Sequence, residues 1–133
     1  DHLEKRERSA LMARVRGRDT KPELIVRRLT HRLGFRFRLH RRELPGSPDL
    51  VFVSRRKVAF VHGCFWHQHK CKRGTRPASN TEFWNSKLDR NRRRDREAVK
   101  LLKKDGWKIL VIWECEVKNE VRLSKRISKF LCE

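Results

Sequence analysis

The sequence VAFVHGCFWHQHKC, residues 58–71, joins a strand-like apolar run to a loop rich in metal-binding side chains. The apolar residues that precede His62 favour a buried strand that ends there. The loop then supplies Cys64, His69 and Cys71, and thiolates and imidazoles are the ligands that zinc prefers. We expect this strand and loop to organise the domain, and a closed tetrahedral site needs a fourth ligand.

Composition limits the class of protein. The chain has 133 residues, enough for one domain with its own core. It carries 36 lysines and arginines against 16 acidic residues, and this net charge of +20 favours nucleic acid as the partner. No transmembrane segment, signal peptide or basic amphipathic helix is evident, which disfavours a membrane. We expect a cytoplasmic protein, nucleoid-associated if bacterial, whose four cysteines bind metal rather than form disulfides.

The remaining sequence alternates between helical and strand-like patterns. Residues 1–18 are charged and predict a basic N-terminal arm that orders on nucleic acid. Helices are expected at 20–33, at 81–105 and from 119 onward, and strands at 35–39, 49–53, 58–62 and 107–113. This order predicts a mixed α/β domain, residues 19–133, with a small central sheet flanked by helices.

Local signals define the faces of these helices. Thr20 and Glu23 predict a capping box at the first helix, and Gly34 predicts its end. The side chains expected to be buried are Ile25, Leu29 and Leu33 in the first helix, Trp84, Leu88, Ala98, Leu101 and Leu102 in the second, and Leu123, Ile127 and Phe130 in the last, which Asn119 caps.

Cys115, Cys132 and His67 are the candidates for the fourth zinc ligand. If strands 58–62 and 107–113 are parallel neighbours, their carboxyl ends meet on one side, and Cys115 then lies beside the loop. Cys132 is close to the C-terminal end of the sequence, where a small buried free cysteine is the simpler interpretation. We hypothesise a structural zinc on Cys64, His69, Cys71 and Cys115.

A second group of residues has the chemistry of phosphodiester cleavage. Asp49 opens one strand and His62 ends the next, which sets a carboxylate beside an imidazole. Asp49 suits magnesium, which prefers oxygen ligands, and His62 and His67 titrate near neutrality, as proton transfer requires. Glu23 could orient a metal-bound water or a histidine. The structural alternatives are a turn or cap for Asp49, and a zinc ligand or a DNA contact for a histidine.

Four segments together resemble a known family: PGSPD at 45–49, HGCFWHQHKC at 62–71, TEFW at 81–84 and GWKILVIWEC at 106–115. They resemble the Vsr family of very-short-patch-repair DNA mismatch endonucleases, and the likeness extends from about Ser9 to about Val117. The resemblance implies a restriction-endonuclease-like fold with a structural zinc. It also implies magnesium-dependent nicking of duplex DNA on the 5′ side of the thymine of a T·G mismatch.

The resemblance also implies roles for single residues. Asp49 matches the metal-binding aspartate, His62 and His67 match the catalytic histidines, and Glu23 matches a supporting glutamate. Val61 stands where a threonine is usual and would serve the magnesium through its backbone carbonyl. The zinc ligands of the family match Cys64, His69, Cys71 and Cys115.

Further positions match the residues by which the family recognises DNA. Phe65 and Trp66 resemble an aromatic wedge that inserts beside the mismatch, with Met12 approaching from the N-terminal arm. Such wedges unstack a base step, and a mismatched step is already weakly stacked. Because these two aromatics lie between charged segments, we expect them to be exposed. Lys87 and Asn91 match helix residues near the mismatch.

Two other functions remain open. One is a zinc-containing nucleic-acid-binding module without catalysis, in which Asp49 and the histidines are structural. The other is a Vsr-like nuclease with a different duplex target, since related nucleases share the catalytic core. Our primary expectation remains a monomeric enzyme that acts on duplex DNA with a T·G mismatch. Repair proteins are possible partners.

Overall fold

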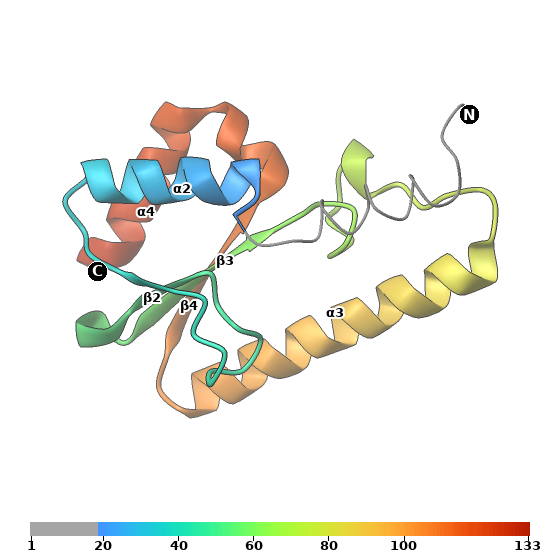
Figure 1. Ribbon diagram of the computed structural model, residues 1–133, viewed down its shortest axis with the longest axis horizontal. Helices are drawn as coiled ribbons and strands as arrows, with labels where there is room; N and C mark the ends of the chain where they lie inside the picture. Colours follow the sequence, from blue (N-terminus) through green and yellow to red (C-terminus); the bar gives the residue numbers. More distant parts are fainter. Residues whose placement is uncertain (1–18) are drawn as a thin grey trace.

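The computed structural model describes residues 19–133, which form a sheet between two layers of helix (Figure 1). The elements are α2 (Lys21–Arg32), β1 (Arg38–Leu39), β2 (Leu50–Phe52), β3 (Lys57–His62), α3 (Thr81–Lys104), β4 (Lys108–Trp113) and α4 (Glu120–Cys132), with 3₁₀ turns at Val53–Arg55, Lys72–Gly74 and Glu114–Lys118. Helices α2 and α4 lie together on one face of the sheet, and α3 lies on the other. The predicted mixed α/β architecture is confirmed. The predicted arm, residues 1–18 with Met12, lies outside the described residues.

The sheet is mixed, and its strand order is β1-β2-β3-β4. β1, β2 and β3 pair antiparallel, whereas β3 and β4 pair parallel, with His62 opposite Trp113. A parallel pair needs a crossover, which α3 and the preceding loop at residues 63–80, named the metal loop, provide. Because β3 and β4 end at the edge where β2 begins, the segments around residues 49, 62 and 115 meet there, as the sequence predicted.

Alternation along the strands divides the core between the two faces of the sheet. One set packs against α2 and α4 and comprises Leu50, Phe52, Ala59, Leu110 and Ile112. The other set packs with Leu102 of α3 and with Trp107, and comprises Val51, Val58, Phe60 and the partly buried Ile109. Both faces are therefore covered, which accounts for the nearly continuous apolar runs in β3 and β4.

The predicted strand 35–39 is wrong over most of its length, because only Arg38 and Leu39 pair with β2. β2 has three residues, so it offers a short ladder. Phe35 and Phe37 still pack against the core, and Phe37 meets Phe52 edge-on at 6.1 Å between ring centroids. Side-chain packing therefore explains the alternation that predicted a longer strand.

Helix α2 begins at the predicted position but differs in detail. Thr20 Oγ1 accepts from the Glu23 N–H at 3.4 Å, whereas the Glu23 carboxylate accepts from the Asp19 N–H at 2.8 Å instead of closing the predicted capping box. The buried residues of α2 are Glu23, Val26, Leu29 and Thr30, whereas Ile25, predicted to be buried, is only partly buried. Leu33, predicted to be buried, is the C-cap residue and is 38% exposed, because the chain turns away at Gly34 with φ of +92°.

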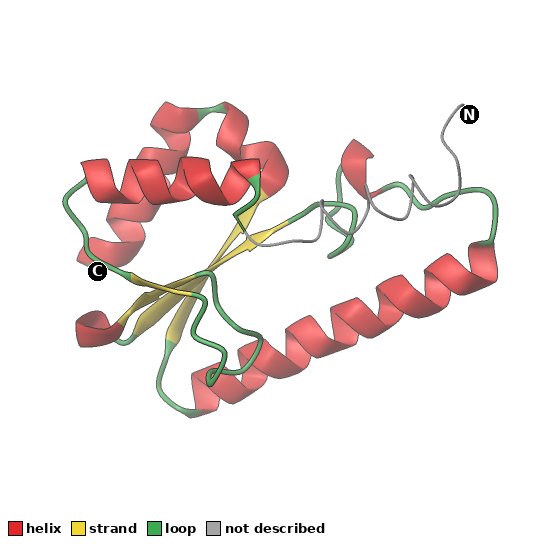
Figure 2. Ribbon diagram, viewed as in Figure 1, coloured by secondary structure: helices red, strands yellow, loops and turns green. Residues whose placement is uncertain are grey.

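Helix α3 matches the predicted range and continues beyond the sheet along the metal loop (Figure 2). Leu88, Ala98 and Leu102 are buried as predicted, whereas Trp84 is only partly buried and Leu101 is 45% exposed. Only the C-terminal part of α3 packs against the sheet core, through Leu102. The rest of the helix can therefore present polar side chains toward the edge where β3 ends.

Helix α4 closes the opposite layer. Asn119 Oδ1 accepts from the Arg122 N–H at 3.1 Å, which confirms the predicted cap. Leu123, Ile127 and Leu131 are buried, and Phe130, predicted in that set, is only partly buried at its rim. Among the described residues, no helix is both long and apolar enough to cross a membrane.

Candidate active site and metal centre

Asp49 lies at the start of β2, where the sheet fixes its position. Its N–H donates to the Ala59 carbonyl at 3.1 Å, and its Oδ2 accepts from the Val61 N–H at 2.6 Å. Burial raises the pKa of Asp49 to about 7, against the lowering effect of the Val61 hydrogen bond, and the neighbouring Glu23 carboxylate raises it further. Burial and the neighbouring negative charge that favour a proton on Asp49 also favour a bound metal cation.

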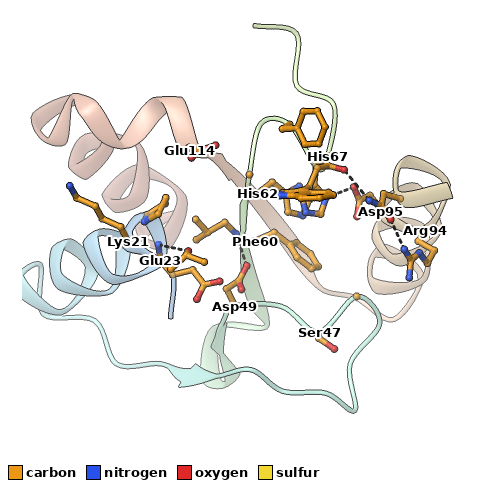
Figure 3. A pocket seen from close by; sticks show the side chains of 18 of the residues that line it. Lys21, Glu23, Ser47, Asp49, Phe60, His62, His67, Arg94, Asp95 and Glu114 are labelled. Carbon is orange, nitrogen blue, oxygen red and sulfur yellow. Dashed lines mark hydrogen bonds and ion pairs between the residues drawn. The ribbon is translucent and has the colours of Figure 1, made fainter. Parts of the chain in front are cut away.

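Glu23 reaches the same place from the first turn of α2. It is buried, and both it and Asp49 line the same cavity (Figure 3). Two carboxylates side by side form an oxygen-donor set that a hard cation such as magnesium prefers. The residues therefore fit the predicted magnesium site, with the Val61 backbone at the neighbouring position of β3.

His62 and His67 form a stacked pair across the cavity from these carboxylates (Figure 3). Their ring centroids are 3.8 Å apart and their planes differ by 4°. Burial lowers the pKa of His62 to about 3, the proximity of His67 lowers it further, and Asp95 opposes this shift. His62 is therefore a neutral imidazole at neutral pH.

Asp95 orients the second histidine from α3. His67 Nδ1 lies 2.6 Å from Asp95 Oδ2, and an ionised carboxylate can only accept. His67 Nδ1 therefore carries the proton, which leaves Nε2 free to accept one. In the group of His62, His67 and Asp95, His67 is therefore a candidate base whose tautomer is fixed by Asp95.

The predicted zinc ligands come together behind this pair. The ligand atoms of Cys64, His69, Cys71 and Cys115 all lie within 4.8 Å of one another. His69 Nδ1 is 3.5 Å from Cys115 Sγ and 3.7 Å from Cys64 Sγ. Tetrahedral zinc with ordinary bond lengths separates a sulfur from a nitrogen by roughly 3.6 Å, so the donor set and its spacing fit zinc.

The surrounding residues also suit a metal centre. The His69 ring stacks on Trp113 with centroids 4.2 Å apart, and Glu114 Oε1 accepts from the Cys64 N–H at 3.2 Å. Such outer contacts hold ligands in position. Of the alternatives for the fourth ligand, Cys132 is exposed near Ser128, and His67 belongs to the histidine pair. Cys115 is thus the residue that the fold brings to the loop.

The aromatic residues of the loop pack on the N-terminal half of α3. Trp66 lies 5.0 Å from Phe65 and 5.9 Å from Trp84 between ring centroids, and Phe65 lies 5.5 Å from Trp84. Trp66 is only 8% exposed and Phe65 is half-buried. The predicted exposure of both rings is therefore wrong for Trp66, because Trp84 of α3 covers it in the protein alone.

One open cavity of 910 Å³ connects the two carboxylates, the histidine pair and the aromatic residues of the loop. Its lining includes Glu23, Asp49, Val61, His62, Phe65, Trp66, His67, Lys87, Asn91 and Asp95. Lys87 and Asn91, the predicted DNA contacts on α3, thus face the same space as the carboxylates. In the described protein, Asn91 Nδ2 donates to the Trp66 carbonyl at 3.2 Å, and Arg94 donates to Asn91 Oδ1.

Asp95 is the residue that sequence reasoning missed. It stands within a run of arginines, where an isolated acid looks like part of a solvated helix face. Its position could have been predicted from the spacing, because Asp95 lies seven residues from both Leu88 and Leu102 and shares their buried face of α3. A half-buried acid on that stripe faces the end of β3 rather than solvent.

The carboxylate pair and the acid-supported histidine suit hydrolysis of a phosphodiester, and the charge of +20 suits a nucleic-acid substrate. Fold and site together therefore suit a nuclease. The family model for DNA mismatch endonuclease Vsr matches residues 1–73. With the curated relatives described next, this match shows that the chain belongs to the Vsr family of endonucleases.

The relatives cover nearly the whole chain. Type II nicking enzyme V.XorIIP of Xanthomonas oryzae pv. oryzae is 47% identical over 131 residues, 98% of this chain and 96% of that protein. Type II nicking enzyme V.NmeAIP of Neisseria meningitidis serogroup A is 40% identical over 126 residues, 95% and 90% of the two chains. DNA mismatch endonuclease Vsr of Escherichia coli K12 is 37% identical over 137 residues, 99% and 88% of the two chains.

Proposed function

We propose that this protein is a magnesium-dependent endonuclease with a restriction-endonuclease-like fold. It nicks one strand of duplex DNA on the 5′ side of the thymine of a T·G mismatch. The single observation that carries the proposal is the shared cavity, which joins the carboxylate pair, the histidine pair and the aromatic loop. The printed names of the relatives, mismatch endonuclease and nicking enzyme, support the same activity.

Each side of the cavity has its own task in cleavage. Asp49 and Glu23, with the Val61 backbone, would hold the magnesium, which would neutralise phosphate charge and activate a water for attack. His67, fixed by Asp95 through Nδ1, exchanges a proton at Nε2. His62 stacks on it as a neutral ring, so the pair carries at most one positive charge beside the phosphate.

The zinc has a structural role in this proposal. It ties the loop that carries Phe65, Trp66 and His67 to Cys115, directly after β4. A loop held in this way keeps its proton-transfer residue in position without a large core of its own. None of the four proposed zinc ligands lines the cavity, which supports a structural role for the zinc.

The aromatic loop and α3 recognise the mismatch in this proposal. Phe65 and Trp66 form the wedge that enters the weakened base step, and Trp66 leaves its contact with Trp84 to do so. Met12 of the N-terminal arm, outside the described residues, is the proposed further contact. Lys87 and Asn91 then face the base pair from α3. The cost of unstacking is smallest at a mismatch, which favours that substrate.

A matched pair of variants tests catalysis against binding. Asp49→Asn removes the charge that holds magnesium and should abolish nicking, while the dissociation constant for duplex DNA stays within about threefold. Glu97→Gln, an exposed change on α3, is the control and should nick like the wild type. Wild-type protein that binds DNA but shows no magnesium-dependent nicking would instead favour the zinc-containing binding module.

A different duplex target is the second candidate, because the relative with 47% identity is a type II nicking enzyme. The combined variant Phe65→Ala and Trp66→Ala should reduce nicking of mismatched DNA far more than nicking of paired DNA. Equal losses on the two duplexes would favour the other target. We propose a monomer in the bacterial cytoplasm, associated with the nucleoid, and repair proteins remain open as partners.

A further inference from the structure

We propose that Arg27 is a positioning residue that acts through Glu23, holding this carboxylate beside Asp49 for the reaction. The inference rests on the proposed function and concerns the wall of the cavity formed by α2. Arg27 is absent from the cavity lining, whereas Glu23 and Asp49 both belong to it. Its guanidinium therefore touches the residue that faces the substrate rather than the substrate itself.

The contacts of Arg27 converge on one atom. Nη2 lies 2.7 Å from Asp19 Oδ1, 2.9 Å from His40 Nε2 and 3.3 Å from Glu23 Oε2. The Arg27 side chain is only 15% exposed, and those of His40 and Glu23 are 10% and 9% exposed. A charged group this far from water must be matched by its neighbours, and here each partner is also nearly buried or acidic.

Asp19, Glu23 and His40 have the composition and spacing of a metal-binding group. The Arg27 guanidinium already lies within hydrogen-bond or ion-pair distance of a ligand atom of all three. The positive charge that these three side chains surround is therefore the Arg27 guanidinium rather than a metal ion. Because an arginine keeps its charge at any relevant pH and donates in fixed directions, it orients Glu23 throughout the pH range of the reaction.

His40 links this cluster to the other carboxylate. Its backbone N–H donates to the Asp49 carbonyl at 3.4 Å, and its φ of +47° turns the chain there. Because arginine only donates, His40 Nε2 accepts from Arg27. Arg27 thus connects α2, which carries Glu23, to the segment paired with Asp49, and fixes the two acids relative to each other.

Without the guanidinium, Glu23 would face a like charge on Asp49 with less to hold it in place. A displaced carboxylate should slow the chemical step more than it weakens DNA binding, since placement errors of about 1 Å can cost roughly 100-fold in rate. Lysine keeps the charge but donates in no fixed plane, so Arg27→Lys should retain only part of the effect.

A double-mutant cycle tests the proposal. Single-turnover nicking is measured for the wild type, Arg27→Ala, Glu23→Ala and the double variant. We expect Arg27→Ala to lower the rate at least 10-fold with DNA affinity within threefold, and to cause no further loss in the Glu23→Ala background. Arg28→Ala is the matched control, because Arg28 is exposed and pairs with Glu120 at 2.9 Å. Multiplicative losses, or equal rates for Arg27→Ala and Arg28→Ala, would overturn the proposal.

Amide exchange provides a readout that needs no activity. The Asp19 N–H donates to Glu23 Oε2 at 2.8 Å, so its exchange should speed up at least 10-fold in Arg27→Ala but not in Arg28→Ala. Arg27→Lys serves as the second variant if Arg27→Ala does not fold, with an intermediate exchange rate expected. If the wild-type protein fails to nick but the Asp19 amide still exchanges faster in Arg27→Ala, the placement of Glu23 is upheld and the proposed function is rejected. Unchanged exchange in the folded variants would reject the placement.

Discussion

The imidazole rings of His62 and His67 stack face to face, with centroids 3.8 Å apart and planes 4° from parallel. At this separation, a proton on one ring opposes a proton on the other. His62 is buried and its pKa is held near 3, whereas His67 faces Asp95. In the proposed mechanism the pair acts as one proton-transfer unit, and Asp95 of α3 orients His67 through Nδ1.

Replacing Asp95 with asparagine should impair this unit. An asparagine amide can donate to Nδ1, which selects the wrong tautomer of His67 and leaves its Nε2 protonated. We expect the nicking rate to fall roughly 100-fold, the lower end of what general acid–base catalysis contributes. Single-turnover rates measure this. Glu97→Gln on the same helix should have no effect, and an Asp95→Asn rate within threefold of wild type would remove Asp95 from the mechanism.

The pKa of Asp49 predicts how magnesium dependence changes with pH. In the metal-free protein this carboxyl has a pKa of about 7, so below pH 7 a proton occupies the group that the metal needs. The half-saturating magnesium concentration should therefore fall as pH rises toward about 7 and level off above it. Nicking rates at several magnesium concentrations from pH 5.5 to 8.5, at constant ionic strength, measure this. A half-saturation point independent of pH would contradict it.

Replacing each cysteine outside the loop with serine should show which of the two binds the zinc. Cys115→Ser breaks the four-ligand cluster and should reduce the zinc content from about one per chain to near zero, with a clear loss of thermal stability. Cys132→Ser leaves the cluster intact and should keep both. Elemental analysis and thermal melts measure this. Retention of zinc in Cys115→Ser would contradict the ligand set.

Gly74 tests how closely the metal loop is packed. A Cβ at this position would lie 2.2 Å from the His69 carbonyl oxygen, a backbone atom beside a ligand. Gly74→Ala should therefore displace His69 and lower zinc affinity. Gly63→Ala is the control for zinc content, since its Cβ would approach Trp66 only to 3.5 Å. Zinc competition with a chelator measures the difference. Equal zinc affinities in the two variants would show that the loop accommodates the added methyl group and would contradict the prediction.

Much of the fold could be predicted because the strong local signals were unambiguous. Thr20, Gly34, Gly106 and Asn119 mark element ends, and the β3 and β4 runs are long enough to identify as strands. The parallel pairing of these strands then placed Cys115 beside the loop. Short strands and helix rims were harder, because Phe35 and Phe37 alternate like a strand while their packing needs only side chains.

The part of the site that was missed depends on contacts distant in sequence. His67 and Asp95 are 28 positions apart, and Arg27 and His40 are 13 apart. Nothing in the local pattern pairs them. The burial of Trp66 likewise depends on where α3 places Trp84. Residue type could therefore nominate candidates such as Asp49 and the four zinc ligands, whereas Asp95, Arg27 and the partners of each residue required the fold.

The most direct test of the central claim is nicking of a labelled duplex that contains one T·G mismatch, beside its fully paired control. Both are incubated with wild-type protein in magnesium and in EDTA. We predict a single nick on the 5′ side of the mismatched thymine, in magnesium only, and little cutting of the paired duplex. Equal cutting of the two duplexes, or cutting that persists in EDTA, would contradict the account.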